Sequence, residues 1–88
     1  MKGPPVQIEM FPTAVHLTRI DPEQNAQRYY YMQVVGDLFG GAALERQWGR
    51  IGRTCRYRLD LFEDHASAVD ALAELARKKV GRGYVRTR

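Results

Sequence analysis

The fold of this 88-residue chain is decided by one segment, AALERQWGRIGRTCRYRLDL, which occupies positions 42–61. Its first part, Ala42–Trp48, has the length and composition of a β-strand. Gly49–Gly52 follows with two glycines, which adopt the positive φ angles of tight turns without steric cost. Cys55–Leu61 then alternates apolar and polar residues at a period of two, which is typical of a second strand. The segment therefore predicts a β-hairpin whose tip carries a tryptophan and several arginines.

The second strand of this hairpin has two chemically different faces. A sheet covered on one side buries its apolar residues and exposes its charged ones, so we expect the apolar set to face the core. We also expect the lone cysteine to be a small core residue. The apolar set consists of Cys55, Tyr57, Leu59 and Leu61, and the charged set of Arg56, Arg58 and Asp60.

Two more strands are predicted before the hairpin, over Ala14–Ile20 and Arg28–Val35, with turn residues between them. The second is rich in aromatic and β-branched residues and apolar on both faces, which favours a central position in the sheet. It contains three consecutive tyrosines, Tyr29–Tyr31, which resemble a stacking platform for bases. Because adjacent strand residues point to opposite faces, we expect two of them in the core and one on the surface.

The hydrophobic period changes after the hairpin. Asp64 or Ser67 can cap a helix that begins at His65 or Ala66, and glycines at 81 and 83 can end it. Tyr84–Val85 is expected either to return as a short strand or to pack on the sheet. The apolar face of the helix consists of Val69, Leu72, Ala73, Ala76 and Val80. The predicted fold class is α+β: a small antiparallel sheet of about four strands with one long C-terminal helix packed on one face.

Length and composition predict a single domain, over residues 13–85, because chains divide into several domains only at greater lengths. A flexible N-terminal arm is expected over residues 1–12 and a basic tail over residues 86–88. No apolar run approaches the roughly 20 residues that a membrane-spanning helix needs. The single cysteine, Cys55, allows no internal disulfide, which is typical of a cytoplasmic protein. We therefore predict a cytoplasmic location and no contact with membranes.

The sequence offers little for catalysis or metal binding. His16 and His65 lie far apart and outside any metal-ligand spacing. No nucleophile and base are recognisable as a pair, and no glycine-rich loop joins a strand to a helix as a nucleotide site would require. We expect no catalytic residue, no metal and no cofactor.

Positive charge is concentrated in the second half of the chain. The net charge is +4, and residues 44–88 contain eleven basic and six acidic residues, against three and four before them. Such charge can be an ordinary solvated surface, but an excess made mostly of arginine favours recognition of phosphate or carboxylate groups. The sequence therefore predicts a nucleic-acid site in the second half.

The tryptophan of the hairpin provides a stacking surface for such a site. An exposed indole beside guanidinium groups can stack on a base or sugar while the arginines bind phosphates. The alternative is a partly buried tryptophan whose glycines only form a turn. The candidate DNA-binding residues are Trp48, Arg50, Arg53, Arg56, Lys79 and Arg82.

The triplet Trp48-Gly49-Arg50 and its surroundings resemble the WGR domain family. The resemblance extends to an aromatic strand ending near Gln33, a strand running through the triplet, a following strand, and an alanine-rich helix followed by Gly83-Tyr84. WGR domains are known from DNA-dependent poly(ADP-ribose) polymerases, where they bind DNA ends. The resemblance implies that Trp48 stacks on a terminal sugar and that Arg50 helps to hold the domain to its neighbours around the DNA. Cys55-Arg56 departs from the Gly-Gln pair that many members carry.

The function predicted from these features is that of a non-catalytic, bacterial-type DNA-binding module that favours duplex ends or nicks. The polymerase activity does not carry over, because no ADP-ribosyl transferase domain is present in the sequence. The alternative is a protein-interaction domain whose hairpin docks on a separately encoded DNA-processing enzyme. Either function is compatible with a monomer or with a weak homodimer formed through a sheet edge.

Overall fold

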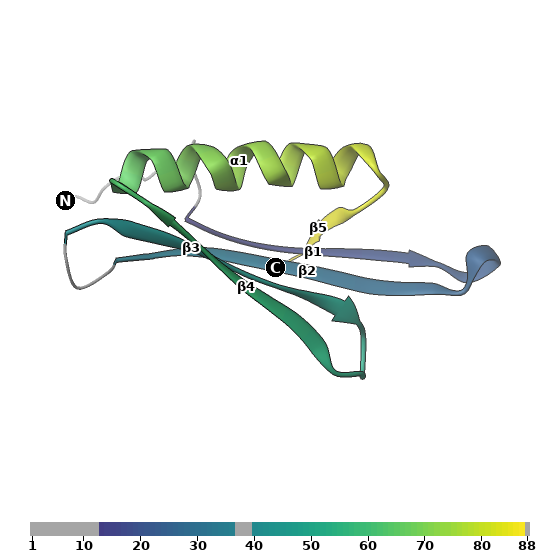
Figure 1. Ribbon diagram of the computed structural model, residues 1–88. Coiled ribbons are helices and arrows are strands. Elements are labelled where there is room, and N and C mark those ends of the chain that lie inside the picture. The colour runs from purple at the N-terminus through teal and green to yellow at the C-terminus, as the bar shows by residue number, and fades with distance from the viewer. Residues whose placement is uncertain (1–12, 37–39, 88) are drawn as a thin grey trace, which may run out of the picture.

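The computed structural model describes residues 13–36 and 40–87, which form one antiparallel sheet with a helix along one of its faces (Figure 1). The predicted α+β class is confirmed. The predicted arm at residues 1–12 lies outside the described residues. In chain order the elements are β1 (Ala14–Asp21), the 3-10 turn η1 (Pro22–Gln24), β2 (Ala26–Gly36), β3 (Ala42–Arg50), β4 (Cys55–Phe62), α1 (His65–Gly81) and β5 (Val85–Thr87).

The sheet has the strand order β4-β3-β2-β1-β5, so that β2 occupies the middle, as its apolar faces predict. The fifth strand arises because the chain returns after α1 and pairs with β1. Arg86 and Thr87 therefore lie in a strand, where the sequence predicts a basic tail. Both hairpin turns, β1–β2 and β3–β4, extend toward the C-terminal end of α1 (Figure 1).

The helix begins as its capping residue predicts. Asp64 accepts a hydrogen bond of 2.8 Å from the backbone N–H of Ser67, which satisfies one free donor of the first turn. The buried helix residues are Ala68, Val69 and Leu72. Val80, predicted to lie on the buried face, is exposed, because it borders an open groove beside the short strand β5. No helix among the described residues has the length and hydrophobicity needed to cross a membrane.

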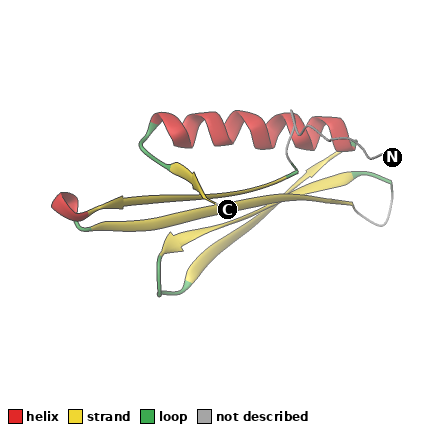
Figure 2. Ribbon diagram, turned by 180° about the vertical axis from the view of Figure 1, so that it is seen from behind, coloured by secondary structure: helices red, strands yellow, loops and turns green. Residues whose placement is uncertain are grey.

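The three tyrosines of β2 divide differently from the prediction. Tyr30 is buried on the helix side, whereas Tyr29 and Tyr31 lie on the opposite face, with ring centroids 6.2 and 6.1 Å from that of His16. The expectation of two core tyrosines is wrong, because α1 covers only one face of the sheet (Figure 2). The neighbours of a residue that faces the helix must point to the uncovered side.

The faces of β4 are also reversed from the prediction. Its alternation is as expected, but the register places Arg56 opposite Trp48 and Asp60 opposite Leu44, a core residue on the helix side. The charged residues therefore face the helix side, and the apolar residues face away from it. This arrangement is possible because β4 is the edge strand, so that its side chains on the helix side still reach water. Cys55, Tyr57, Leu59 and Leu61 are all exposed, and the expectation that they form core is wrong.

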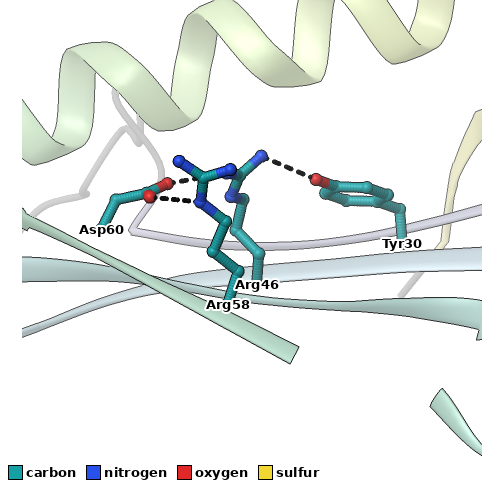
Figure 3. Close-up of polar contacts among 4 residues, drawn as sticks. All are labelled: Tyr30, Arg46, Arg58 and Asp60. Atoms are coloured by element: carbon teal, nitrogen blue, oxygen red, sulfur yellow. Dashed lines mark hydrogen bonds and ion pairs between the residues drawn. The ribbon is translucent and has the colours of Figure 1, made fainter. Parts of the chain in front are cut away.

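One arginine lies between the sheet and the helix. The side chain of Arg46 is 13% exposed, and it binds Asp60 at 2.9 Å and donates a hydrogen bond of 3.0 Å to the hydroxyl of Tyr30. Arg58 binds the same carboxylate at 2.7 Å. Figure 3 shows the two guanidinium groups converging on Asp60 from β3 and β4. Asp60 thus neutralises a charge that the core would otherwise leave largely desolvated.

Replacing Asp60 with Asn is therefore expected to lower the free energy of unfolding by about 2–3 kcal/mol, slightly below the loss for a fully buried pair because Asp60 keeps some contact with water. Urea denaturation followed by circular dichroism measures this loss. Asp70→Asn is the matched control, since it removes an exposed carboxylate from α1. Equal stability of the two variants would contradict the role of Asp60.

Candidate nucleic-acid interface

A row of three arginines crosses the sheet on the helix side. The register places Arg19 of β1 opposite Arg28 of β2, and Arg28 opposite Arg50 of β3. Like charges directly opposite each other destabilise a sheet. The row therefore costs stability in the free protein and would be stabilised by an anion lying between the guanidinium groups.

Trp48 lies in the next row, between this arginine row and the hydrophobic core. Its ring stacks on that of Tyr30, with centroids 5.4 Å apart and planes inclined by 14°, and the guanidinium carbon of Arg46 is 5.9 Å from its centroid. The indole is half-buried and packs against the core cluster. The expectation of an exposed indole at the hairpin tip is thus corrected: Trp48 lies within β3 and exposes only part of its ring.

The exposed part of the indole borders a pocket of about 440 Å³. Its walls come from β2, β3, the start of β4 and the segment after α1, which are far apart in the sequence. Arg56, opposite Trp48 in the register, is exposed and contributes one side of the pocket. The lining residues are Arg28, Trp48, Gly49, Arg50, Thr54, Arg56 and Tyr84.

The two glycines beside Trp48 have different structural roles. A Cβ on Gly49 would lie 3.2 Å from both the Cα of Cys55 and the carbonyl oxygen of Thr54, so that a side chain here would require the backbone of β4 to move away by a few tenths of an ångström. Gly52 has a φ of 84° and supplies the left-handed conformation of the turn. The turn therefore begins after Arg50, because Gly49 and Arg50 still pair with β2, and not at Gly49 as predicted.

The arginines of the hairpin differ in how firmly they are held. The guanidinium group of Arg50 donates hydrogen bonds to the backbone oxygen of Asn25 at 3.1 Å and to its side-chain oxygen at 3.4 Å. Arg53 is exposed in the turn, and its backbone N–H donates to Arg50 O at 3.0 Å. Arg50 is thus oriented before any ligand binds, whereas Arg53 lies outside the pocket lining.

The end of α1 adds two cations near the pocket. The ammonium of Lys79 lies 4.4 Å from the ring centroid of Tyr30 and 5.6 Å from that of Tyr84. Burial lowers the pKa of Lys79, and the positive charges of Arg82, Arg46 and Arg28 lower it further. Arg82 itself is exposed at the end of the helix. These effects indicate a region of concentrated positive charge next to Trp48.

The cations around the pocket have no acidic partner in the described part of the chain. Within the described ranges, 13–36 and 40–87, ion pairs join Arg46 and Arg58 to Asp60, and Arg77 to Glu74. None of them includes the arginines of the pocket, Lys79 or Arg82. Nor do three histidine, cysteine or carboxylate side chains gather in these residues as a metal site would require.

Arg28 and Tyr84 line the pocket but were not predicted from the sequence. Each lies far from the Trp-Gly-Arg triplet along the chain, and only the strand register and the return of the chain after α1 bring them to it. Arg28 immediately precedes the three tyrosines, but nothing local distinguishes it from a solvated charge. Trp48, Arg50 and Arg56, in contrast, are brought together in one pocket.

In a comparison with known protein families, the WGR domain matches residues 13–88 of the chain. The chain belongs to the WGR domain family. WGR domains are binding modules whose general role is to bind nucleic acids. In this chain the triplet Trp48-Gly49-Arg50 supplies a half-buried ring, a close strand contact and a cation.

A relative of this WGR domain is the uncharacterized protein y4dW of Sinorhizobium fredii (strain NBRC 101917 / NGR234). The two are 38% identical over 73 residues, which cover 83% of this chain and 36% of that protein. The chain thus spans about a third of the length of this relative. No solved structure matches the chain.

The charge around Lys79 can be tested directly. Arg82→Gln is expected to raise the pKa of Lys79, because it removes one of the positive charges that lower it. NMR titration of the lysine Cε resonance measures the change. Arg86→Gln is the matched control, since it removes the same charge from β5, at a residue outside the groups that lower this pKa. An equal rise in both variants, or none in Arg82→Gln, would contradict the described cluster.

Proposed function

We propose that this WGR domain is a non-catalytic DNA-binding module that favours duplex ends or nicks. The observation that carries the proposal is the pocket in which the half-buried ring of Trp48 meets the guanidinium groups of Arg28, Arg50 and Arg56. A ring beside several unneutralised cations suits a ligand that has both a flat or sugar-like group and phosphates.

The packing of Trp48 supports a preference for ends. One side of its ring is occupied by Tyr30, so that only the remaining part borders the pocket. The pocket volume of about 440 Å³ is within the range of roughly 300–1,000 Å³ that is typical of small-ligand sites. Such a pocket would hold a single terminal sugar or base. Inside a continuous duplex each base is stacked on both sides and is not available to it.

The cations divide into two groups in this proposal. Arg28, Arg50 and Arg56 line the pocket and would bind the phosphates nearest the end. Lys79 would add its charge from the end of α1. Burial and neighbouring cations disfavour its ammonium form, and a bound phosphate would stabilise it. Arg53 and Arg82, both exposed, would contact phosphates farther along the backbone.

The phosphate contacts predict a strong dependence on salt. If Arg28, Arg50, Arg56 and Lys79 each neutralise one phosphate, the logarithm of the binding constant should fall against that of salt concentration with a slope of about −3.6. Arg28→Gln and Arg56→Gln should each make the slope shallower by about 0.9. Fluorescence anisotropy with a labelled blunt duplex measures both. Arg77→Gln is the matched control, because its charge is already paired with Glu74. An unchanged slope in the pocket variants would contradict the proposal.

The role of Trp48 predicts a loss that depends on the form of the DNA. Trp48→Ala should weaken binding to duplex ends by about 1–3 kcal/mol, roughly 5- to 150-fold, and Trp48→Phe by less, because the smaller ring keeps part of the stacking. Binding to closed-circular duplex should change little, since only phosphates are contacted there. Competition anisotropy with blunt, nicked, closed-circular and single-stranded DNA measures the preference.

An equal loss for ends and closed circles would indicate a damaged fold and would not support stacking. A lack of measurable affinity for every form of DNA, at every salt concentration, would favour the alternative function instead. In that alternative, the β3–β4 hairpin docks on a separately encoded DNA-processing enzyme, and Trp48→Ala would impair that association.

A further inference from the structure

The edge strand β4 presents an apolar stripe to solvent on the side away from α1. Tyr57, Leu59 and Leu61 are 54%, 46% and 70% exposed. Their alternation is the pattern of a strand that buries one face, yet residues 13–36 and 40–87 leave this face uncovered. Contiguous exposed apolar residues are typical of an interaction site. Among the described strands β4 pairs with β3 alone, so its other backbone edge is available to another strand.

We propose that β4 pairs antiparallel with β4 of a second copy of this chain, about a two-fold axis through Leu59. This inference is independent of DNA binding. The charges of the strand are self-complementary about Leu59, since Arg58 precedes it and Asp60 follows it. In the pair, Arg58 lies opposite Asp60 of the second copy, and this contact occurs twice.

The neighbouring registers, centred on Tyr57, Arg58 or Asp60, are less favourable. A two-fold axis perpendicular to the sheet must lie midway between the two copies of one residue (called an axis through that residue), because directly opposed residues share a face. An axis through Tyr57 would place Arg56 opposite Arg58 of the second copy, and axes through Arg58 or Asp60 would place each opposite itself. Like charges in these positions are repulsive. The axis through Leu59 avoids every such contact between the two strands.

The same axis also covers the apolar stripe. Leu59 lies opposite Leu59 of the second copy, and Tyr57 lies opposite Leu61, so the exposed side chains of both copies form one continuous patch across the join. Asp60 retains its contacts with Arg46 and Arg58, because a carboxylate has room for a further donor.

The chemistry of this face favours a second copy over nucleic acid. None of the described strand residues that point away from α1 is an arginine or a lysine, whereas the helix side carries the arginine row and Trp48. A polyanion would therefore find no partner beside Tyr57, Leu59 and Leu61. A copy of the same strand supplies both the apolar surface and the opposite charges.

The proposed dimer is a continuous sheet of ten strands with both helices on one side, because the axis is perpendicular to the sheet. The two Trp48 pockets then share this side. Each Trp48 lies three residues along β4 (about 10 Å) and about one and a half strand spacings (about 7 Å) from the axis, which places the two pockets about 25 Å apart. Two DNA-binding sites on one face would bind a single long ligand together.

Sedimentation velocity of the full chain without DNA tests the proposal, and its result does not depend on the proposed function. Across concentrations from roughly 10 μM to 1 mM, where small interfaces associate, the mass should rise from 10.1 kDa toward twice that value. Leu59→Glu and Leu59→Lys should each remain monomeric, because like charges then meet at the axis. An equimolar mixture of the two should dimerise again, since Glu and Lys would lie opposite each other.

Ile20→Glu is the matched control, because Ile20 is also exposed on the side away from α1 but lies on β1, far from the join. It should dimerise as the unmodified chain does. Leu59→Glu places a second carboxylate opposite Glu45, so circular dichroism must show that it folds, and Leu59→Lys lacks this difficulty. A monomeric unmodified chain at all concentrations, dimers in either Leu59 variant alone, or a monomeric mixture would overturn the proposal.

Discussion

The stack of Trp48 on Tyr30 is the contact on which the arrangement of this protein depends. Tyr30 is buried in the core, and its hydroxyl accepts a hydrogen bond from Arg46, which Asp60 neutralises. One side of the indole is thereby held against a rigid support, and the rest borders the cationic pocket. A ring placed in this way is oriented before a ligand arrives, which reduces the entropic cost of binding.

The helix on one face of the sheet gives the two faces different chemistry. On the helix side, the core ends at Trp48, and the row of Arg19, Arg28 and Arg50 lies beyond it. The other face has tyrosines, apolar residues and glutamines. The proposed nucleic-acid recognition and self-association therefore use different residues of one small sheet and do not compete.

Much of the fold could be predicted because it rests on local chemistry. The alternation in β4, the glycine of the β3–β4 turn and the capping carboxylate of Asp64 each act within a few residues, so they are recognisable in the chain itself. The faces of β4 could not be predicted in this way. The assumption that apolar residues point to the core fails at an edge strand, where charged residues on the helix side still reach solvent.

The sequence by itself determined the class of fold, the family and the central triplet Trp48-Gly49-Arg50, because these follow from periodicity and from a compact motif. Only the tertiary structure decided which cations surround the indole. Arg28 and Tyr84 reach the pocket through strand register and through the return of the chain after α1. Such contacts join residues that are distant in sequence. They are set by the pairing of whole strands, which no local sequence pattern contains.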